Sequence, residues 1–243
     1  MKILVCISHV PDTTSKIGFT DGDTKFDSNG VQFIIGPYDD YAIARAVELK
    51  ESNGAAVTAI NVGGVETEPT IRKALAIGAD DAIRINAEPV DSLFVAQQIA
   101  NVAKDGGYDL ILMGRESIDY NGGQVHAMVG EILGIPSISP IMKLDIDGNS
   151  AKMSREIEGG KEFLEANMPF VAGCQEPIAE WKIPNMRGIM TARTKPLNVV
   201  EPVANEASVN YQNYELPAAK SGVKMADSVD QLVDMLKNDA KVL

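Results

Sequence analysis

The segment DLILMGRESIDYNGGQVHAMVGEILG, residues 109–134, decides the fold. A mostly apolar run ends at Gly114, a polar loop follows, and the pair Gly122-Gly123 precedes a stretch with the apolar spacing of a helix. A strand, a turn and a helix in this order form the repeating unit of a sheet whose parallel strands are connected by helices. The segment therefore predicts an α/β fold.

Three further apolar runs support this interpretation, at residues 3–7, 56–62 and 82–85. Each is followed by a turn and a stretch with helical spacing, and runs that are apolar on both faces suit a buried parallel sheet. Asp39 and Asp91 stand where helix N-caps are expected, each followed by apolar residues at helical spacing. The alternation through about residue 134 predicts a doubly wound, Rossmann-like, mostly parallel sheet whose ligand crevice lies beyond the carboxyl ends of the strands.

The pattern changes after Gly134. Residues 138–147, 148–157 and 162–174 alternate as extended segments joined by turns at Asp147-Gly148 and Gly159-Gly160, which predicts antiparallel strands added to the far edge of the sheet. Residues 196–225 have little periodicity, and MADSVDQLVDMLKND (225–239) predicts a last amphipathic helix capped near Ser228. We therefore expect a nucleotide-binding α/β domain over 1–195 and a C-terminal arm over 196–243 that folds back or packs on a partner subunit.

Composition excludes several classes of protein. The 243 residues carry a formal charge of -12, the wrong sign for a protein that neutralises a phosphate backbone, so nucleic acid is not an expected partner. Two cysteines and two histidines are too few for a disulfide framework, a thiolate zinc site or the usual catalytic triads. No apolar run reaches the length of a membrane span, and Met1 leads directly into a strand-like segment, so we expect a bacterial-type cytoplasmic protein without membrane insertion.

The same segment that decides the fold also predicts a phosphate site. Main-chain N–H groups at a helix N-terminus attract anions, and Gly122 and Gly123 lack the Cβ atoms that would keep the backbone from a ligand oxygen. The Asp39-Asp40 pair and Gly63-Gly64 should reach the same end of the sheet. Neither GxGxxG nor GxxxxGK[ST] is present, so a structural turn with a helix cap is an alternative explanation of the glycines.

Five motifs, in order along nearly the whole chain, resemble those of the small (beta) subunit of electron transfer flavoprotein. They are ILVCISHVPDTTSKI (3–17), PTIRKALAIGADDAIRI (69–85), GRESIDYNGGQ (114–124), SREIEGGKEFLEANMPFV (154–171) and SGVKMADSVDQLVDMLK (221–237). The third keeps the family frame G-x-x-x-I-D-x-x-x-x-Q through Gly114, Ile118, Asp119 and Gln124.

The resemblance implies a heterodimer with a larger alpha subunit that holds most of an FAD. Such a heterodimer carries electrons from acyl-CoA and related dehydrogenases, as in fatty acid beta-oxidation, to a membrane quinone oxidoreductase. The beta subunit serves as scaffold, nucleotide holder and docking partner without catalytic residues of its own. Its crevice holds AMP in most members and a second FAD in electron-bifurcating relatives.

By motif position, the resemblance carries nucleotide contacts to one set of residues and partner contacts to another. The nucleotide set is Cys6, Ser8, Gly36, Pro37, Tyr38, Asp39, Val62, Gly114, Arg115, Glu116, Ser117, Ile118, Asp119, Tyr120, Asn121, Gly122, Gly123, Gln124 and Val125. The partner set is Ile183 and Met186, in a loop that docks on dehydrogenases, and Glu156, which faces the flavin domain of the alpha subunit.

Some residues depart from the family pattern, so alternative interpretations of the bound nucleotide and of the function remain. Gly36 stands where the family commonly has Asn, and Ser8 stands where it has a lysine. The segment VPDT and the Asp39-Asp40 pair resemble bifurcating members. A stand-alone adenine-nucleotide-binding regulatory module on the same α/β layer is the competing function, and an adenylate-transferring enzyme is disfavoured because a phosphate-loop lysine is missing.

Overall fold

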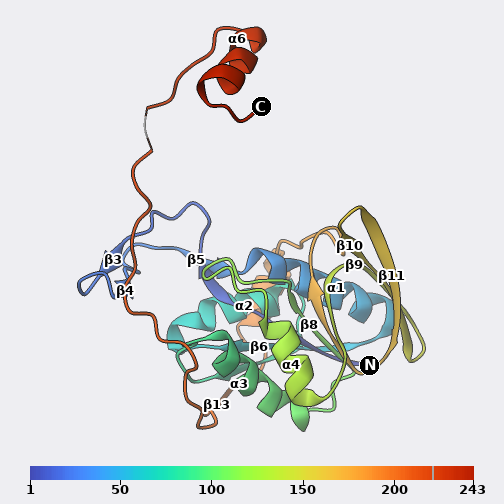
Figure 1. Cartoon of the computed structure of the whole chain (residues 1–243). Coiled ribbons are helices and arrows are strands. Elements are labelled where there is room, and N and C mark those ends of the chain that lie inside the picture. The colour runs from blue at the N-terminus through green and yellow to red at the C-terminus, as the bar shows by residue number, and fades with distance from the viewer. Residues whose placement is uncertain (221) are drawn as a thin grey trace. The chain divides into compact units, whose positions relative to one another are not determined.

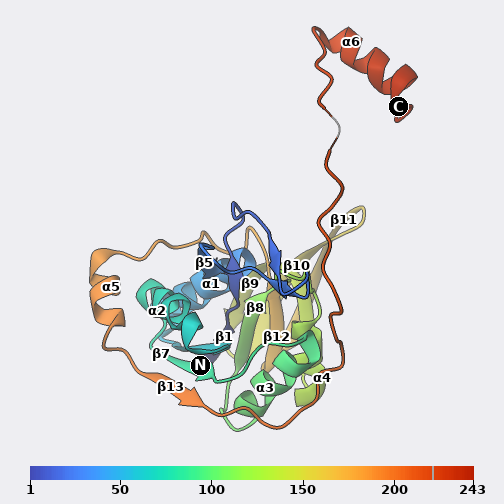
Figure 2. The same ribbon diagram turned by 90° about the vertical axis from the view of Figure 1, so that its left-hand side faces the viewer.

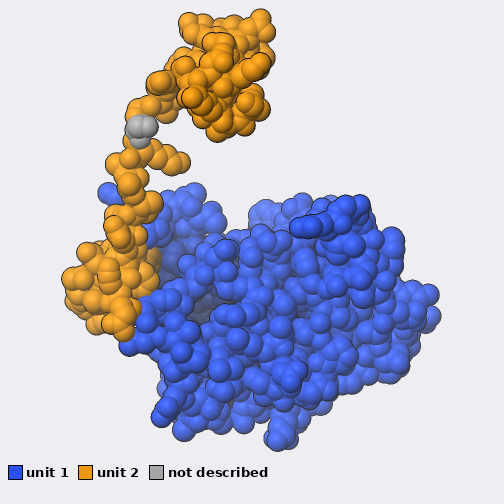
Figure 3. All heavy atoms as spheres, in the orientation of Figure 1, with its two compact units in different colours: residues 1–17, 28–211 blue, residues 18–27, 212–243 orange. Residues whose placement is uncertain are grey.

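A computed structural model describes residues 1–220 and 222–243 of the chain, so Ser221 of the tail motif lies outside the described residues. The chain forms two compact units, which Figure 3 distinguishes by colour. Unit 1 comprises Met1–Ile17 and Ser28–Tyr211, and unit 2 comprises Gly18–Asp27 and Gln212–Leu243.

Unit 1 is built around a nine-stranded sheet with the order β11-β10-β9-β12-β8-β1-β6-β7-β13 (Figure 1). All neighbours from β9 to β13 pair in parallel, whereas β10 runs antiparallel to both β9 and β11. The strands are β1 Lys2–Cys6, β6 Ala56–Val62, β7 Asp81–Ile85, β8 Leu110–Gly114, β9 Ser137–Asp147, β10 Ser150–Ile157, β11 Gly160–Asn167, β12 Phe170–Cys174 and β13 Leu197–Val200. The mixed α/β sheet confirms the predicted doubly wound, Rossmann-like class.

Helices cover both faces of this sheet (Figure 2). One face carries α1 (Pro37–Asn53) and α2 (Glu68–Ile77), with the short η1 (Val65–Thr67) before α2, and the other carries α3 (Ser92–Lys104) and α4 (Val125–Leu133). The helix α5 (Met186–Ala192) packs on α2. Two apolar cores result, one on each face, as expected for a sheet whose strands are buried on both sides.

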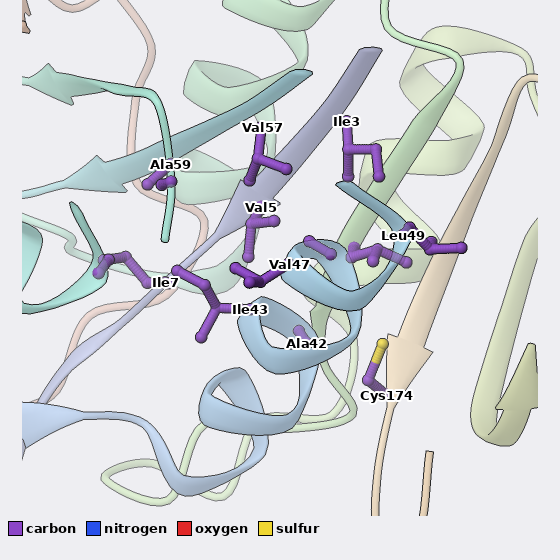
Figure 4. Packing of buried hydrophobic residues seen from close by; sticks show 14 of the residues in the cluster. Ile3, Val5, Ile7, Ala42, Ile43, Val47, Leu49, Val57, Ala59 and Cys174 are labelled. Carbon is purple, nitrogen blue, oxygen red and sulfur yellow. The ribbon is translucent and has the colours of Figure 1, made fainter. Parts of the chain in front are cut away.

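The packing of α1 shows why these strands and helices form where they do. Ala42, Ile43 and Val47 face β1 and β6, where Val5 and Val57 are fully buried (Figure 4). The apolar residues at helical spacing after Asp39 therefore face the sheet, as predicted. Its predicted cap was wrong, because the N-cap is Gly36 and the carboxyl group of Asp39 bonds to other segments of the chain. The predicted cap of α3 is confirmed, since the Asp91 side chain accepts a hydrogen bond from the Phe94 N–H at 2.7 Å.

The far edge of the sheet is only partly as predicted. The strands β9, β10 and β11 form the expected antiparallel extension. Residues 170–174 were expected to continue it, but β12 instead lies parallel between β8 and β9, fully buried along its length. The apolar run FVAGC has no polar face to leave in water, which explains its interior position. Residues 197–200 form β13, a parallel edge strand that the sequence did not predict.

The remaining elements are short. In unit 1, β2 (His9–Pro11) pairs with β5 (Phe33–Ile35). Unit 2 contains the hairpin of β3 (Phe19–Thr20) and β4 (Lys25–Phe26), the helix α6 (Val229–Asp234) and its continuation η2 (Met235–Asp239). Within unit 2, the Tyr214 ring stacks on Phe19 with centroids 5.0 Å apart. The Ser228 cap of α6 is confirmed, because its side chain accepts a hydrogen bond from the Gln231 N–H.

Across residues 1–220 and 222–243, none of the helices combines the length and the apolar character that crossing a membrane requires.

Candidate functional site

Three predicted site residues meet at one end of the sheet. Cys6, Val62 and Gly114 end the adjacent strands β1, β6 and β8, and all three are buried. The structure thus brings together the three loops that follow these strands, as expected when parallel strands end at one edge. The helix α1 begins at the same edge, since Gly36 N–H donates to the Ser8 carbonyl.

Asp39 joins these loops to one another. Its Oδ2 accepts hydrogen bonds from Ser8 N–H at 2.8 Å and Ser8 Oγ at 2.5 Å, and its Oδ1 accepts one from Gly114 N–H at 2.8 Å. The side chain is almost fully buried, and burial raises its pKa to about 6 even though the hydrogen bonds from Ser8 and Gly114 lower it. Both carboxyl oxygens therefore form hydrogen bonds within the chain, and Asp39 holds the loops at this end of the sheet together.

Two glycines make this junction possible. A Cβ atom on Gly36 would overlap Ser8 Oγ and stand 2.5 Å from Asp39 Oδ2. A Cβ atom on Gly114 would stand 2.6 Å from Asp39 Oδ1 and 2.7 Å from the Tyr38 Cβ. All of these distances are too short for a Cβ atom. A side chain at either position would therefore push Asp39 out of its hydrogen bonds, so both positions require glycine. The departure from the family pattern at Gly36 thus has a reason within this chain.

The loop between β8 and α4 contains most of the predicted nucleotide contacts. It is pinned by a bridge between Ser117 and Gly122, and Asn121 adopts a left-handed conformation with φ of 51°. Asp119 organises its tip, because Oδ1 accepts hydrogen bonds from the Ser117 hydroxyl and from Tyr120 N–H at 2.8 Å. The Tyr120 ring stacks on Tyr211, with centroids 5.0 Å apart.

The Gly122-Gly123 pair has no reason within the described chain to be glycine. Neither residue has a positive φ, and the nearest described atom to a Cβ on Gly123 would be the Arg115 carbonyl oxygen at 3.6 Å, an ordinary contact. A Cβ on Gly122 would stand 3.4 Å from Ser92 Oγ. A structural turn alone therefore does not require glycine at these two positions. Close approach of a ligand to the main chain would require it.

Four helices begin at this edge, α1, α2, α3 and α4, and they differ in charge. The first turn of α1 contains Asp39 and Asp40, the first turn of α2 contains Glu68, and α3 is capped by Asp91, so acidic groups oppose the binding of an anion at these three starts. The first turn of α4 contains no acidic residue, and among described residues its N-cap Gln124 makes no side-chain cap hydrogen bond. The start of α4 is therefore the better place for a phosphate group, and the residues present fit one.

Arg115 reaches across the strand ends. Its Nη1 donates to Gln175 Oε1 at 2.8 Å, its Nη2 lies 3.3 Å from Glu116 Oε1, and its guanidinium lies 5.0 Å from the Tyr38 ring centroid. Gln175 was missed by the sequence analysis because residues 170–174 were placed at the sheet edge. The five-residue apolar run after Pro169 is typical of an interior parallel strand. This pattern would have placed Gln175 at the end of such a strand, near the other strand ends.

The histidines and cysteines are packed within unit 1. His9 bonds to Thr70 Oγ1 at 2.8 Å and stacks on Phe33, while His126 lies 3.3 Å from Ser137 Oγ. Burial lowers the pKa of both imidazoles, and burial raises the pKa of the Cys6 and Cys174 thiols. No group of three or more potential metal ligands gathers in the part of the chain that the structure describes.

The predicted partner contacts lie on two separate elements. Ile183 and Met186, at and just before the start of α5, are 74% and 73% exposed. Glu156 lies on β10, near the opposite edge of the sheet from β7 and β13. Residues 188–192 belong to the helix α5, and the Met186 side chain is exposed instead of packed beneath them.

Comparison with known proteins gives consistent matches. A family model described as the electron transfer flavoprotein domain matches residues 23–205. The chain is 35% identical to the electron transfer flavoprotein subunit beta of Bacillus subtilis, with 100% of both chains covered. It is 34% identical to the subunit beta of Syntrophomonas wolfei, covering 100% of this chain and 98% of the relative, and 31% identical to the mitochondrial subunit beta of Arabidopsis thaliana, with both chains fully covered.

Proposed function

The chain belongs to the electron transfer flavoprotein subunit beta family, and from this premise we propose that it pairs with a larger alpha subunit. The heterodimer carries electrons from acyl-CoA and related dehydrogenases to a membrane quinone oxidoreductase. An FAD shared with the alpha subunit supplies the redox chemistry, and the present chain supplies no catalytic residue. The bacterial cytoplasm is the proposed location.

The crevice at the strand ends holds AMP in this proposal. The observation that carries it is the difference among the helix starts at this edge, because of these helices only α4 has no acidic residue either at its N-cap or in its first turn. The main chain around Gly123 and Val125 would hold the phosphate, and the ends of β1 and β6, at Cys6 and Val62, would form the floor. The orientation of these loops depends on Asp39, which uses both carboxyl oxygens in hydrogen bonds within the chain.

A second FAD in the same crevice is the alternative, as in electron-bifurcating relatives. The segment VPDT (10–13) favours it by resemblance. In the structure this segment leads from β2 into a turn in which Asp12 Oδ1 accepts hydrogen bonds from the Thr14 N–H and hydroxyl.

The dehydrogenase docks on the residues around the start of α5. Ile183 and Met186 are exposed apolar side chains, and Trp181 and Met190, exposed by 57% and 68%, extend the same segment. Large apolar side chains that remain in water beside one another commonly mark a contact site. Glu156 serves a different contact, with an arginine of the flavin domain of the alpha subunit.

The C-terminal arm over residues 196–243 packs on the alpha subunit. Support comes from the apolar side chains that unit 2 leaves exposed. These are Leu216, Val223, Met225, Val229, Leu232, Val233, Val242 and Leu243. The helix α6 has no buried residue of its own, so a second surface is needed to cover its apolar positions.

Co-expression with an electron transfer flavoprotein alpha subunit tests the proposal. A yellow complex of one alpha and one beta chain is expected, and its nucleotides are to be released by denaturation and quantified by chromatography. One FAD and one AMP per heterodimer support the proposal, whereas two FAD support the bifurcating alternative. A colourless chain that purifies alone with bound nucleotide would instead identify a stand-alone regulatory module.

A further inference from the structure

The contact between α2 and α5 contains a reciprocal arrangement of two cations. Arg72, in α2, donates from Nη1 to the carbonyl oxygens of Ala192 and Lys195, at 2.8 and 2.7 Å. Lys195, three residues after α5 ends, donates from Nζ to the carbonyl oxygens of Leu75 and Ala79, at 2.8 and 2.6 Å. Each segment therefore supplies the cation that binds the C-terminal carbonyl groups of the other, where the helix dipole favours positive charge.

The two helices also approach closely at Gly188. A Cβ atom there would overlap the main-chain carbonyl oxygen of Ala76, in α2, so only glycine allows the observed spacing. Asn185 fixes the start of α5, because its side chain accepts a hydrogen bond from Gly188 N–H at 2.8 Å. The start, middle and end of α5 are thus each fixed by a specific polar or main-chain contact.

Apolar burial cannot supply this fixation. The helix α5 has seven residues, all of them described, and only Ala192 is buried. A helix of this length is not stable on its own in water, and Ala192 together with the covered part of Ile189, which is 42% exposed, contributes only a modest apolar area. The hydrogen bonds of Arg72 and Lys195 are therefore the main contacts that keep α5 folded against α2.

We propose that Arg72 and Lys195 are positioning residues for dehydrogenase docking, which hold α5 so that Ile183 and Met186 are presented in a fixed orientation. The inference rests on the docking role proposed above. Neither cation contacts the partner in this scheme. Their effect on docking comes from preorganisation, because a segment that is already ordered loses less conformational entropy when the partner binds.

Amide hydrogen exchange in the assembled heterodimer tests the positioning role directly. Arg72→Met keeps much of the apolar stem and removes the guanidinium donors. We expect exchange in peptides covering 186–195 to accelerate at least about 10-fold, because these amides then open locally, while peptides from β1 and β6 keep their protection. Lys195→Met, which changes the other half of the pair and lies outside the core, should act in the same direction.

Arg45→Met is the matched control. Arg45 is likewise half-buried and donates to a main-chain carbonyl, that of Leu144, but it lies on α1 next to β9. It should leave exchange in 186–195 unchanged. If exchange in 186–195 is also unchanged in both Arg72→Met and Lys195→Met, the positioning role is overturned.

Electron transfer from an acyl-CoA dehydrogenase, reduced by its own acyl-CoA substrate, provides the second measurement. Arg72→Met should raise the KM for the heterodimer about 10-fold and leave kcat unchanged, since chemistry at the flavin is not altered. Met186→Ala in the same assay reports on docking alone. If Met186→Ala raises the KM and Arg72→Met does not, the inference fails while docking stands. If Met186→Ala leaves the KM unchanged, the docking proposal fails and the positioning role falls with it.

Discussion

Asp39 Oδ1 accepts a hydrogen bond from the main-chain N–H of Gly114 at 2.8 Å, which ties the first turn of α1 to the end of β8. The two residues are 75 positions apart in the sequence. With Ser8 bonded to Oδ2, one buried carboxyl group connects the segment after β1, the helix α1 and the end of β8 at the edge where the nucleotide is proposed to bind.

The titration of Asp39 should be visible in the stability of the protein. Burial raises its pKa from an ordinary 3.8 to about 6, so the folded state binds a proton more tightly than the unfolded state. The contribution of Asp39 to the free energy of unfolding is therefore fully present below about pH 4. It falls by about 3 kcal/mol as the pH rises to about 6, since each pKa unit corresponds to about 1.4 kcal/mol. Above pH 6 it should be constant.

Asp39→Asn isolates this contribution, because Asn does not titrate. The measurement is the free energy of unfolding of the wild type minus that of the variant, from pH 4 to pH 8. We expect this difference to fall between pH 4 and 6. A difference that rises with pH would mean that the three hydrogen bonds outweigh burial. At pH 7.5 the NH2 group of the introduced Asn also faces a main-chain N–H group, and two donors cannot bond to each other. This mismatch should cost about 1–3 kcal/mol of stability.

Gly123→Val should remove the nucleotide without unfolding the chain. The Cβ atom has room within the described protein, so melting should remain close to that of the wild type. A branched side chain at the start of α4 would nevertheless keep a phosphate from the main-chain N–H groups. The readout is nucleotide content per heterodimer after denaturation. Gly160→Val is the control, since no described atom lies within 4 Å of its Cβ position, and stoichiometric nucleotide in both variants would contradict the proposed site.

Met186→Ala should slow electron transfer from a dehydrogenase and leave melting unchanged. Its side chain is 73% exposed, so truncation removes little from the core. An anchor that fills a partner pocket costs about 2 kcal/mol on truncation, or roughly 30-fold in affinity. Met153→Ala provides the contrast, because Met153 is 3% exposed and its truncation should cost about 2–5 kcal/mol of stability. Lowered melting of Met186→Ala with unchanged transfer would rule out docking at this residue.

Glu156→Ala should shift the orientation of the alpha subunit's flavin domain without loss of FAD. The expected effect is modest, because an exposed ion pair contributes about 0–1 kcal/mol. Glu162→Ala is the control. Glu162 lies on β11, the strand paired with β10, and its carboxylate already pairs with Arg155 Nε at 2.5 Å within the chain. Interdomain distance distributions measured for both variants check the prediction, and identical distributions for Glu156→Ala and the wild type would refute it.

Asp91→Ala should loosen the beginning of the C-terminal arm. Asp91 Oδ2 accepts hydrogen bonds from Ser208 N–H and Oγ and from Val209 N–H, in addition to the Phe94 cap at Oδ1. Burial raises the pKa of Asp91, but these hydrogen bonds lower it further, so the net pKa lies below the ordinary value. Its stabilising contribution is therefore present above about pH 4 and is lost as pH falls.

Hydrogen exchange in peptides covering 203–211 measures this loosening. Exchange should accelerate in Asp91→Ala, and loss of the cap should cost about 1 kcal/mol of stability. Ser228→Ala removes a different helix cap, that of α6, and should leave these peptides unchanged. Equal protection in Asp91→Ala and the wild type would show that other contacts hold the arm.

The sequence by itself determined the elements whose signal is local. Runs apolar on both faces predicted β1, β6, β7 and β8, since a parallel strand between two helical layers has no solvent-facing side. The caps at Asp91 and Ser228 were likewise found from the sequence, because a side chain and an N–H group three residues away form the bond. The resemblance of five motifs identified the family, which the comparisons then showed.

Contacts between distant segments became visible only in the three-dimensional fold. Asp39 had the sequence features of a helix cap, yet its partners are Ser8, in the connection after β1, and Gly114, at the end of β8, both distant in the chain. The apolar run at 170–174 is typical of an interior strand, but its position between β8 and β9, which brings Gln175 to Arg115, is set by the order of the whole sheet. Arg72 and Lys195 are more than 100 residues apart, so their reciprocal capping leaves no periodic signal. Sheet order and helix packing depend on the free energy of the whole fold, and a local pattern contains no information about it.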